Sequence, residues 1–461
     1  MKIQSINPAN GKILKEFENF TKAKVDSAVE NARDTQITWQ KTTFEERAEL
    51  FKRLKKVMHK RSAEILELIK EETGKMTPDC EAELYDVIDA VDYYLGEFSK
   101  VKIQNYTFNP ETFPKTTAEI QYVPQGVIGL ILPWNFPFYP PMVYIIPALV
   151  SGSAVVFKPS EYSTLVGLLC KELFVEASFP KDLIQILIGD EKVGKLLVKS
   201  SINKLFMIGS VEAGKDILQN FGIRPVQLEL GGNSAALVLE DADLNLAAKS
   251  IAWGGTYNAG QECVSVKRVY VVKKVADKFL VKITKIVKNL RAGIDYGPYI
   301  RMEALEKVYR RIQDSRKNGA KVLCGGDKLD RNNGYWLSPS VILAKNDDIE
   351  LIKKETFGNT VPVVIVKNED EAISKANDTN YGLSNSVFSM NIKNAEEIAV
   401  KLESGLVSIN ETFITFPGWD HWTGWKDSGI ETTESKIQQC LKKKVVSKNE
   451  SGKKRSFWYP Y

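Results

Sequence analysis

The sequence predicts an α/β protein with two lobes, each built around a mainly parallel β-sheet. Its 461 residues suggest two or three domains at about 150 residues per domain. From residue 126 onward, short runs rich in Val, Ile and Leu alternate with helical stretches. This is the spacing of βαβ units joined by right-handed crossovers. The composition, 43% hydrophobic and 26% charged, is that of an ordinary globular protein.

The first hundred residues are predicted to be helical. Thr43 and Glu46 match a capping box that opens an amphipathic stretch to about Arg61. Gly74 is expected to end the next helix, because glycine readily adopts the left-handed conformation found at helix C-termini. Residues 101–122 then alternate Thr, Tyr, Phe and Ile, a pattern that predicts a hairpin projecting from the body.

Two series of strands follow, and the division between them lies near residue 229. The first series is predicted at residues 127–132, 154–157, 183–188, 204–208 and 226–230. The second series is predicted at residues 234–239, 266–272, 361–366 and 406–410. Helical stretches separate the strands in both series, so each series is expected to form its own sheet.

The segment from Ile120 to Phe157 contains no charged residue and therefore raises the question of a membrane span. Six prolines and the polar break at 151–153 interrupt it, so no continuous spanning helix fits. Parallel strands buried on both faces give the same charge-free pattern. We therefore expect this segment to form the interior of a sheet. The N-terminus lacks the apolar core of a signal peptide, so we also expect a cytoplasmic protein.

Positive charge is concentrated at the C-terminal end. The chain carries a net charge of +5, whereas residues 441–461 alone hold seven basic side chains and one acidic side chain, a charge of +6. The preceding 440 residues therefore carry −1 and show no bias toward nucleic-acid binding. The tail is expected to be a solvated end beside an intersubunit strand, with a membrane or nucleic-acid contact as the alternative.

Cysteine and histidine usage narrows the chemistry. The five cysteines are far apart and form no CxxC pair, which argues against a disulfide framework and a structural zinc site. The two histidines are His59, in a basic helix and expected to be solvated, and His421, in a tryptophan-rich loop. A histidine-rich metal site is thereby excluded, and no metal is expected.

Cys263, in the polar turn Asn-Ala-Gly-Gln-Glu-Cys, is the candidate nucleophile. A free cysteine is usually a small buried hydrophobe, but such cysteines normally lie within apolar runs. A thiol with a pKa of about 8.5 is mostly protonated at pH 7, so its surroundings must help it react. Glu262 would hinder ionisation if its carboxylate pointed inward, and we expect it to point away.

Two further residues suit chemistry at the ends of buried strands. Glu229 ends a strand and precedes two glycines; burial would raise its pKa and suit a general base, with a structural ion pair as the alternative. Asn135 lies between two prolines, where its amide could hold an oxyanion or serve as a turn residue. Ligands bind at this edge of α/β sheets.

Nucleotide binding rests on weaker signals, because no GxGxxG fingerprint occurs. Gly209 and Ser210 follow a strand and begin a helix, where backbone N–H groups could hold a phosphate, although an ordinary strand-to-helix turn looks identical. Lys158 and Glu161 follow another strand and offer the cation and carboxylate suited to a ribose.

Together, eight motifs resemble the aldehyde dehydrogenase superfamily in their order and spacing. They are PWNFP at 133, KPSE at 158, GS at 209, ELGG at 229, GQEC at 260, ETFG at 355, NDTNYGLSNSVFS at 377 and KDSG at 426. The resemblance implies oxidation of a small-molecule aldehyde to its carboxylic acid, with a cofactor domain built on a variant Rossmann sheet that lacks the glycine fingerprint.

The same resemblance implies a role for each candidate residue. Cys263 would form a thiohemiacetal and then a thioester, Asn135 would hold the oxyanion, and Glu229 would activate the hydrolytic water. NAD is the implied cofactor, with NADP as a weaker alternative. Cofactor contacts are implied at Ile131, Trp134, Lys158, Ser160, Glu161, Gly209, Ser210, Glu355 and Phe357.

The implied organisation has three parts and a homodimer or homotetramer as the assembly. An NAD(P)-binding domain would comprise residues 1–105 and 123–228, and a catalytic domain residues 229–428. A small β oligomerisation element would comprise residues 106–122 and 429–461.

The chain departs from the family pattern at four places, and the last of them touches the expected substrate mouth. Asn359 stands in place of a usual proline, Tyr144 in place of a frequent lysine, and residues 291–298 form a shortened loop. A tryptophan-rich segment, 416–429, replaces a common anchor loop. The expected walls, which favour an apolar or aromatic aldehyde, are Phe136, Tyr139, Val143, Tyr257, Trp419 and Trp422.

Three rival functions are separated by particular residues. A CoA-acylating dehydrogenase would share the fold, but that branch characteristically lacks the glutamate found here at position 229. A cysteine hydrolase or transferase would need no dinucleotide site. A non-enzymatic protein on the same fold would need no combination of Cys263, Glu229 and Asn135.

Overall fold

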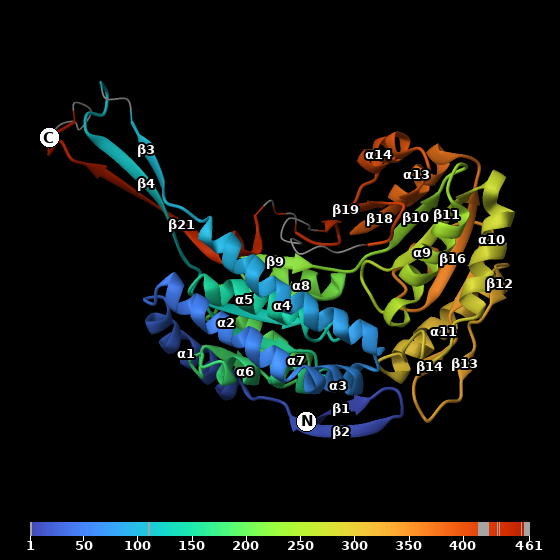
Figure 1. The fold of residues 1–461 in the computed structure, drawn as a ribbon, viewed down its shortest axis with the longest axis horizontal. Coiled ribbons are helices and arrows are strands. Elements are labelled where there is room, and N and C mark those ends of the chain that lie inside the picture. The colour runs from blue at the N-terminus through green and yellow to red at the C-terminus, as the bar shows by residue number, and fades with distance from the viewer. Residues whose placement is uncertain are drawn as a thin grey trace.

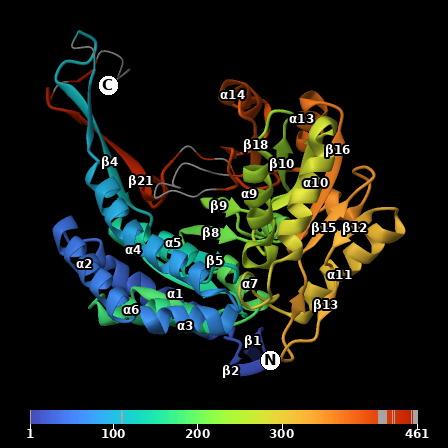
Figure 2. The same cartoon turned by 45° about the vertical axis from the view of Figure 1, so that its right-hand side comes forward.

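The computed structural model describes residues 2–108, 111–413, 424–430, 432, 434–452 and 454–455. Two lobes and a projecting arm are visible in Figure 1 and, from a second direction, in Figure 2. One lobe contains a five-stranded sheet and the other a seven-stranded sheet, while the arm is a three-stranded sheet. The predicted α/β class is therefore confirmed.

The five-stranded sheet is entirely parallel, in the order β7-β6-β5-β8-β9. Its strands are β5 (Val127–Leu132), β6 (Ala154–Pro159), β7 (Ile184–Ile186), β8 (Lys204–Ile208) and β9 (Val226–Glu229). All five were predicted to within two residues at either end. Every residue of β6 is buried, which confirms that the charge-free segment forms a sheet interior.

Helices cover both faces of this sheet. The connections α5 and α6 pack together on one face beneath α2, α3 and α4, whereas α7 packs with α1 and α8. Right-handed crossovers place these two groups on opposite faces. The bounds are α1 (Lys22–Trp39), α2 (Phe44–Lys60), α3 (Ser62–Thr73), α4 (Thr77–Ser99), α5 (Tyr139–Val150), α6 (Thr164–Glu176), α7 (Glu191–Lys199) and α8 (Val211–Asn220).

The predicted helix boundaries in the first hundred residues are confirmed, but the strands there were missed. Thr43 and Glu46 form the capping box of α2, and Gly74, with a φ of 74°, ends α3. Residues before α1 form an antiparallel hairpin of β1 (Lys2–Asn7) and β2 (Lys12–Glu18). This hairpin is mostly exposed, so hydrophobic patterning gave little sign of it.

The second sheet has the order β12-β15-β16-β11-β10-β18-β19, with only β12 antiparallel to its neighbour. Its strands are β10 (Ser234–Val238), β11 (Val266–Val272), β12 (Lys321–Cys324), β15 (Ser340–Leu343), β16 (Thr360–Val366), β18 (Ser384–Phe388) and β19 (Leu406–Ile409). Ala235 and Leu237 pack in one hydrophobic cluster and Ala236 and Val238 in another. The alternation shows that both faces are covered.

Strands β12, β15 and β18 were not predicted. In β18 the polar residues Ser384 and Asn385 are buried and hydrogen-bonded rather than solvated. Asn385 accepts from the backbone of Ala235 and donates to Ser404. A strand whose buried positions are filled by satisfied polar groups lacks the apolar run used to recognise it.

The remaining elements of this lobe lie over the faces and edges of the sheet (Figure 2). Its helices are α9 (Leu244–Thr256), η1 (Tyr257–Gly260), α10 (Lys273–Lys288), α11 (Met302–Lys317), α12 (Glu350–Lys353), α13 (Glu369–Asn377) and α14 (Ile392–Lys401). Two small ribbons add β13 (Lys328–Leu329) with β14 (Trp336–Leu337), and β17 (Tyr381–Gly382) with β20 (Trp425–Lys426).

The arm extends away from both lobes (Figure 1). It contains β3 (Gln104–Thr107), β4 (Thr116–Pro124) and β21 (Leu441–Asn449), with β4 in the middle. The predicted hairpin is confirmed, and the C-terminal strand pairs with β4 along nine residues. The short helix α15 (Lys436–Gln439) leads into β21. In the described part of the chain, no helix has the length and hydrophobicity needed to cross a membrane.

Candidate active site

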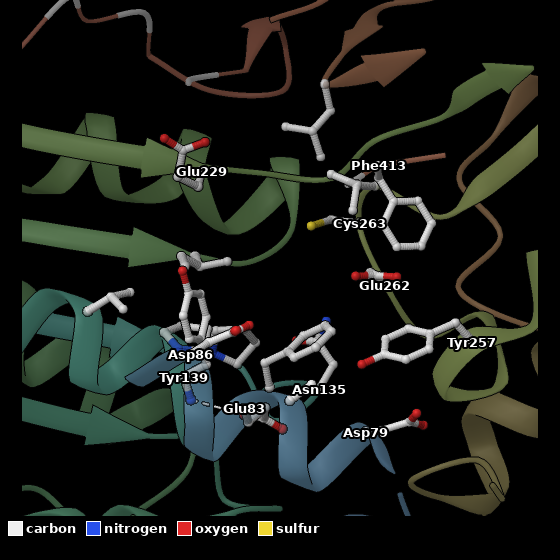
Figure 3. A pocket seen from close by; sticks show the side chains of 18 of the residues that line it. Asp79, Glu83, Asp86, Asn135, Tyr139, Glu229, Tyr257, Glu262, Cys263 and Phe413 are labelled. Carbon is white, nitrogen blue, oxygen red and sulfur yellow. Dashed lines mark hydrogen bonds between the residues drawn. The ribbon is translucent and has the colours of Figure 1, made fainter. Parts of the chain in front are cut away.

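A cavity of about 520 Å³ brings together side chains from both lobes. Asn135, Glu229 and Cys263, which are far apart in the sequence, all line it. Figure 3 shows Cys263 and Glu229 on one side of this pocket and Asn135 on the other. The structure thus collects the three predicted catalytic residues around a single space.

The turn before Cys263 has an unusual backbone. Asn258, Ala259 and Gly260 have φ values of 47°, 54° and 68°, all in the left-handed region. Such a run costs energy and persists only where the surroundings fix it. Gly260 is required here, since a Cβ would lie 2.2 Å from the carbonyl oxygen of Gly358.

Hydrogen bonds from Gln261 hold this turn in place. Its side-chain amide donates to the carbonyl oxygens of Asn258 and Pro298, both at 3.1 Å, and its Oε1 accepts from the backbone N–H of Ile300 at 2.9 Å. Gln261 is itself buried. The turn that presents Cys263 is therefore anchored to residues 298–300 of the shortened loop region.

The surroundings of Cys263 are acidic. Burial raises the pKa of its thiol, and the neighbouring carboxylates of Glu262, Glu355 and Glu229 raise it further. The prediction that Glu262 points away is wrong: Glu262 lines the same cavity. It is 6% exposed, and within the described residues its Oε2 has no hydrogen-bond partner.

Glu229 is the last residue of β9. Its Oε1 accepts a hydrogen bond of 3.4 Å from Gln227, whereas its buried Oε2 has no partner among the described residues. Burial raises its pKa to about 7, against a smaller opposing effect of Lys436. A carboxylate with an available oxygen and a pKa near neutrality is suited to accept a proton from water.

Asn135 lies in the loop between β5 and α5, and a buried acid fixes the end of that loop. Glu83 accepts 3.0 Å hydrogen bonds from the backbone N–H groups of Phe138 and Tyr139. It also forms a 2.6 Å ion pair with Lys75, and both side chains are almost fully buried. The backbone oxygen of Asn135 accepts from Asn258 at 3.1 Å, which ties this loop to the Cys263 turn.

Six of the predicted cofactor residues lie at one edge of the five-stranded sheet: Ile131, Lys158, Ser160, Glu161, Gly209 and Ser210. Ile131 lies in register with Lys158 on one side and Met207 on the other, near the carboxyl ends of β5, β6 and β8. Lys158 and Glu161 form an ion pair at 3.5 Å. Ser210 caps the start of α8 by accepting from the N–H of Ala213.

At the same edge, Ser160 lies between Lys158 and Glu161 in the sequence and is buried. Gly209 immediately precedes Ser210, the N-cap residue of α8. The N-terminus of a ten-residue helix offers N–H groups and a positive dipole end to a phosphate. A nearby carboxylate and ammonium suit ribose hydroxyls. The donor set therefore fits the pyrophosphate and adenosine portions of a dinucleotide.

Of three other predicted cofactor residues, Glu355 acts on the Cys263 thiol, and Trp134 and Phe357 contact each other. The rings of Trp134 and Phe357 are 5.7 Å apart and nearly perpendicular. Glu355 accepts from the N–H of Gly232 at 3.2 Å, and a Cβ on Gly231 would lie 2.4 Å from its Oε2. The two glycines after Glu229 thus allow the Glu355 carboxylate to approach the backbone closely.

The expected pocket walls are confirmed where the structure describes them. Phe136, Tyr139, Val143 and Tyr257 line the cavity, and Phe136 stacks on Tyr257 with centroids 6.2 Å apart. Trp419, Trp422 and His421 lie outside the described residues. Tyr144 also lines the cavity, with the Lys436 ammonium 5.5 Å from its ring centroid.

Asn359, the residue found in place of a usual proline, is buried, and its side chain and backbone N–H take part in three hydrogen bonds. Its side chain accepts from the Tyr299 hydroxyl at 2.8 Å and donates to the Leu337 carbonyl at 3.0 Å, while its N–H donates to Tyr299. Proline could supply neither N–H group. The substitution therefore serves packing behind the 355–358 loop.

Several lining residues were not singled out from the sequence: Asp79, Glu83 and Asp86 of α4, Trp253 of α9 and Lys436 of α15. The three acids follow the i, i+4, i+7 spacing of one helix face, which was the available signal. No group of three potential metal ligands occurs among the residues that the structure describes.

Comparison with known proteins agrees with this arrangement. A model of the aldehyde dehydrogenase family matches residues 1–446. The chain is similar to lactaldehyde dehydrogenase from Escherichia coli, with 29% identity, a TM-score of 0.92, and coverage of 97% of this chain and 96% of that one. It is also similar to betaine aldehyde dehydrogenase from Staphylococcus aureus, solved with NAD+, with 29% identity, a TM-score of 0.94, and coverage of 100% and 94%. The chain therefore belongs to the aldehyde dehydrogenase family and is an enzyme that oxidises aldehydes.

Proposed function

We propose that this enzyme oxidises its aldehyde to the carboxylic acid with NAD, using Cys263 as nucleophile and Glu229 as general base. One observation carries the proposal most directly: Glu229 and Cys263 line the same cavity, and Glu229 keeps a buried oxygen without a partner among the described residues. A CoA-acylating enzyme would not need that carboxylate. Glu229 therefore favours hydrolysis of the acyl group.

The first stage uses Cys263 and Asn135. Addition of the Cys263 thiol to the aldehyde gives a thiohemiacetal, whose oxygen is held by the Asn135 side-chain amide and the Cys263 backbone N–H. Both donors belong to rigid turns, so they need little reorganisation as negative charge develops. Bound NAD supplies the acceptor for the hydride that leaves the thiohemiacetal carbon as the thioester forms.

The second stage uses Glu229. Its available Oε2 removes a proton from water, and the resulting hydroxide equivalent attacks the thioester carbon. The carboxylic acid leaves, and the sulfur of Cys263 regains a proton. A pKa of about 7 for Glu229 allows it to accept this proton near neutral pH and to release it again between turnovers.

The cofactor residues support NAD over NADP. The structurally similar betaine aldehyde dehydrogenase was solved with NAD+. In this chain the Glu161 carboxylate, paired with Lys158, would accept hydrogen bonds from ribose hydroxyls and repel a 2′-phosphate. Two unit charges about 4 Å apart interact by roughly 1 kcal/mol in water and roughly 4 kcal/mol near a protein surface. Lys158 offsets part of this repulsion, so we propose a preference of about tenfold to a hundredfold.

The remaining contacts are assigned by position. Ile131, Ser160, Gly209 and Ser210 would flank the adenosine and pyrophosphate at the edge of the sheet. Trp134, Glu355 and Phe357 would flank the nicotinamide riboside near Cys263. Each group is placed by the strand end or loop that precedes it.

We further propose that the chain comprises a cofactor domain (1–105 and 123–228), a catalytic domain (229–428) and the arm. The arm would join copies of the chain into a homodimer or homotetramer. The arm corresponds to the oligomerisation element predicted at 106–122 and 429–461. Its outer strand β21 is nine residues long and lies at a sheet edge. Such an edge has unpaired backbone groups that another chain can bind, and four basic residues of the tail, Lys442, Lys443, Lys444 and Lys448, belong to this strand.

A direct assay tests the proposal. Purified protein, NAD and butanal should produce NADH, whereas Cys263→Ala should reduce the rate by at least about a thousandfold. Cys324→Ala is the matched control, because Cys324 is also partly exposed but lies outside the pocket. It should retain wild-type activity.

The same assay separates the rival functions. Acid formation without NADH would indicate a hydrolase, and dependence on CoA would indicate an acylating enzyme. NADH production that survives in Cys263→Ala would overturn the nucleophile. Replacement of NAD by NADP in this assay measures the proposed cofactor preference.

A further inference from the structure

The face of α4 toward the pocket carries an acidic stripe. Asp79, Ala82, Glu83 and Asp86 all line the cavity, in the i, i+3, i+4, i+7 pattern of one helix face. A helix rises about 1.5 Å per residue, so the two aspartates are separated by about 10 Å along its axis. This distance is sufficient for the stripe to follow a substrate several atoms long.

The described part of the pocket wall has an excess of negative charge. Its carboxylates are Asp79, Glu83, Asp86, Glu229 and Glu262, and Lys436 supplies the one ammonium among the described lining residues. Lys436 acts on Glu229 and lies against the Tyr144 ring. The charge of Lys436 therefore acts near Glu229. Figure 3 shows Asp79 on the opposite side of the view.

The aspartates of the stripe also differ from Glu83. Glu83 is neutralised by the buried ammonium of Lys75. Asp79 and Asp86 form no ion pair with any residue that the structure describes. Burial raises the pKa of Asp79 to about 6, although the Lys75 ammonium opposes the shift. Only burial and the neighbouring acids Asp89 and Glu83 act on Asp86 and raise its pKa, so Asp86 faces the cavity without a compensating cation among the described residues.

A second, independent observation comes from Glu262 on the other wall. Its side chain is 94% buried, lines the cavity, and has an oxygen without a hydrogen-bond partner among the described residues. Figure 3 shows its carboxylate between Cys263 and Tyr257. A buried carboxylate oxygen is costly unless a donor or a cation meets it. The ammonium groups of Lys75 and Lys267 act on Glu262, but its Oε2 accepts no hydrogen bond from the described residues. This oxygen is therefore available to a positively charged or donor-rich ligand.

Aromatic rings complete the same part of the wall. Trp253 lies 5.1 Å from Tyr257 and 5.0 Å from Phe413, measured between ring centroids, and Tyr257 stacks on Phe136. The faces of such rings attract ammonium groups, and the attraction adds to that of carboxylates. Rings alone would suit an apolar aldehyde, but rings combined with unpaired carboxylates suit a cation.

We propose that the physiological aldehyde carries an ammonium group, which lies between the rings and the carboxylates of Asp79 and Asp86 while its carbonyl lies at Cys263. This inference rests on the proposed function of Cys263. It replaces the apolar or aromatic aldehyde expected from the sequence. Asp79 and Asp86 thereby become specificity-determining residues.

Isosteric aldehydes test the role of charge. 3-Aminopropanal and butanal have the same number of non-hydrogen atoms but differ by one positive charge, and 4-oxobutanoate and 4-methylpentanal differ by one negative charge. We expect kcat/KM to favour 3-aminopropanal over butanal by about tenfold to a hundredfold. We expect 4-oxobutanoate to be at least about tenfold poorer than 4-methylpentanal.

Variants locate the effect on the stripe. Asp79→Asn and Asp86→Asn should each lower the ratio of kcat/KM for 3-aminopropanal over butanal, and the double variant should bring it to within about threefold of unity. Asp89→Asn is the matched control, because Asp89 lies on the same helix but does not line the cavity. It should leave the ratio unchanged.

The outcomes distinguish this inference from the proposed function. Equal kcat/KM for 3-aminopropanal and butanal, or a preference for 4-oxobutanoate, would overturn the ammonium proposal while NADH production upheld the dehydrogenase. An unchanged ratio in the double variant would overturn the assignment to α4. Failure to oxidise any of the four aldehydes would overturn the proposed function itself, and the inference with it.

Discussion

Two pairs of buried glutamates in this enzyme have the same chemistry but different surroundings. In the helical layer, Glu72 accepts hydrogen bonds from Ser5, Leu165 and Val166 at 2.7–2.9 Å. Glu83 accepts from two backbone N–H groups and pairs with Lys75. In the pocket, by contrast, Glu229 and Glu262 each keep an oxygen with no partner among the described residues.

The comparison shows that the extent of hydrogen bonding distinguishes the glutamates that hold helices from the glutamates that keep an available oxygen. The carboxylates of Glu72 and Glu83 accept hydrogen bonds from the first N–H groups of α6 and α5, respectively. A negative charge at a helix N-terminus also interacts favourably with the helix dipole. The oxygens of these two glutamates are committed to holding those helices. The oxygens left over on Glu229 and Glu262 are available to water or substrate, at the expense of local stability.

The largest expected effect on stability is at Glu83. Glu83→Gln leaves the buried Lys75 ammonium without its carboxylate, and removal of one partner of a buried pair typically costs about 3–5 kcal/mol. We expect a loss of that size in urea unfolding, together with a lower kcat/KM, because the loop that presents Asn135 loses its anchor.

Glu81→Gln is the control for this prediction, since Glu81 lies on the exposed side of α4. It should change stability by less than about 0.5 kcal/mol. If Glu83→Gln changed the free energy of unfolding as little as Glu81→Gln, the conclusion that the Glu83 carboxylate stabilises the fold would be wrong.

The next effect is catalytic. Glu229→Gln removes the general base but no committed hydrogen bond to a helix, so stability should be maintained. Rapid mixing should show one NADH per active site as a burst, followed by turnover that is about a hundredfold to a thousandfold slower, or roughly 2.7–4 kcal/mol in the barrier. Unchanged steady-state turnover would contradict the role in hydrolysis.

Loss of both the burst and the turnover would sharpen the comparison instead. It would show that Glu229 also removes the thiol proton of Cys263, whose pKa is raised by burial and by three carboxylates. Glu262→Gln then provides the matched measurement, because it removes the other carboxylate with an available oxygen.

Much of the fold and the central site could be predicted from the sequence, for a physical reason. Strands such as β5 and β6 are buried on both faces, so their apolar runs are unambiguous. Glu229 is the last residue of β9, and Asn135 and Cys263 lie in turns beside such elements, where position in the sequence fixes position at a sheet edge. The eight-motif resemblance added their roles.

What could not be predicted depended on contacts between distant segments. Glu262 lines the cavity, and no local sequence pattern reports that direction. The acids of α4 look like the solvated face of an ordinary helix until β5 and α5 place the Asn135 loop beside them. Likewise, the buried strand β18 begins with three polar residues, Ser384, Asn385 and Ser386, and Asn385 is satisfied there by hydrogen bonds with Ala235 and Ser404.

The smallest effect concerns pH and tests whether a fully satisfied carboxylate is charged. Burial raises the pKa of Glu72 to about 7, although its hydrogen bonds from Ser5, Leu165 and Val166 oppose the shift. The unfolded chain has a pKa of about 4.3 at this residue. Between these two values the folded protein holds the proton and the unfolded chain does not, so stability should fall as pH rises from about 4.5 to 7 and level off above that.

The measurement is the difference in free energy of unfolding between wild type and Glu72→Gln across this pH range, in which all other titrating groups cancel. We expect the free energy of unfolding of wild type, relative to that of Glu72→Gln, to decline by up to about 3 kcal/mol toward pH 7. Glu72→Gln has no titrating group at this position, so it lacks the decline. A difference that rises with pH would mean that the three donors outweigh burial and keep Glu72 ionised. Completion of hydrogen bonds would then determine the charge of a buried glutamate in this enzyme as well as its role.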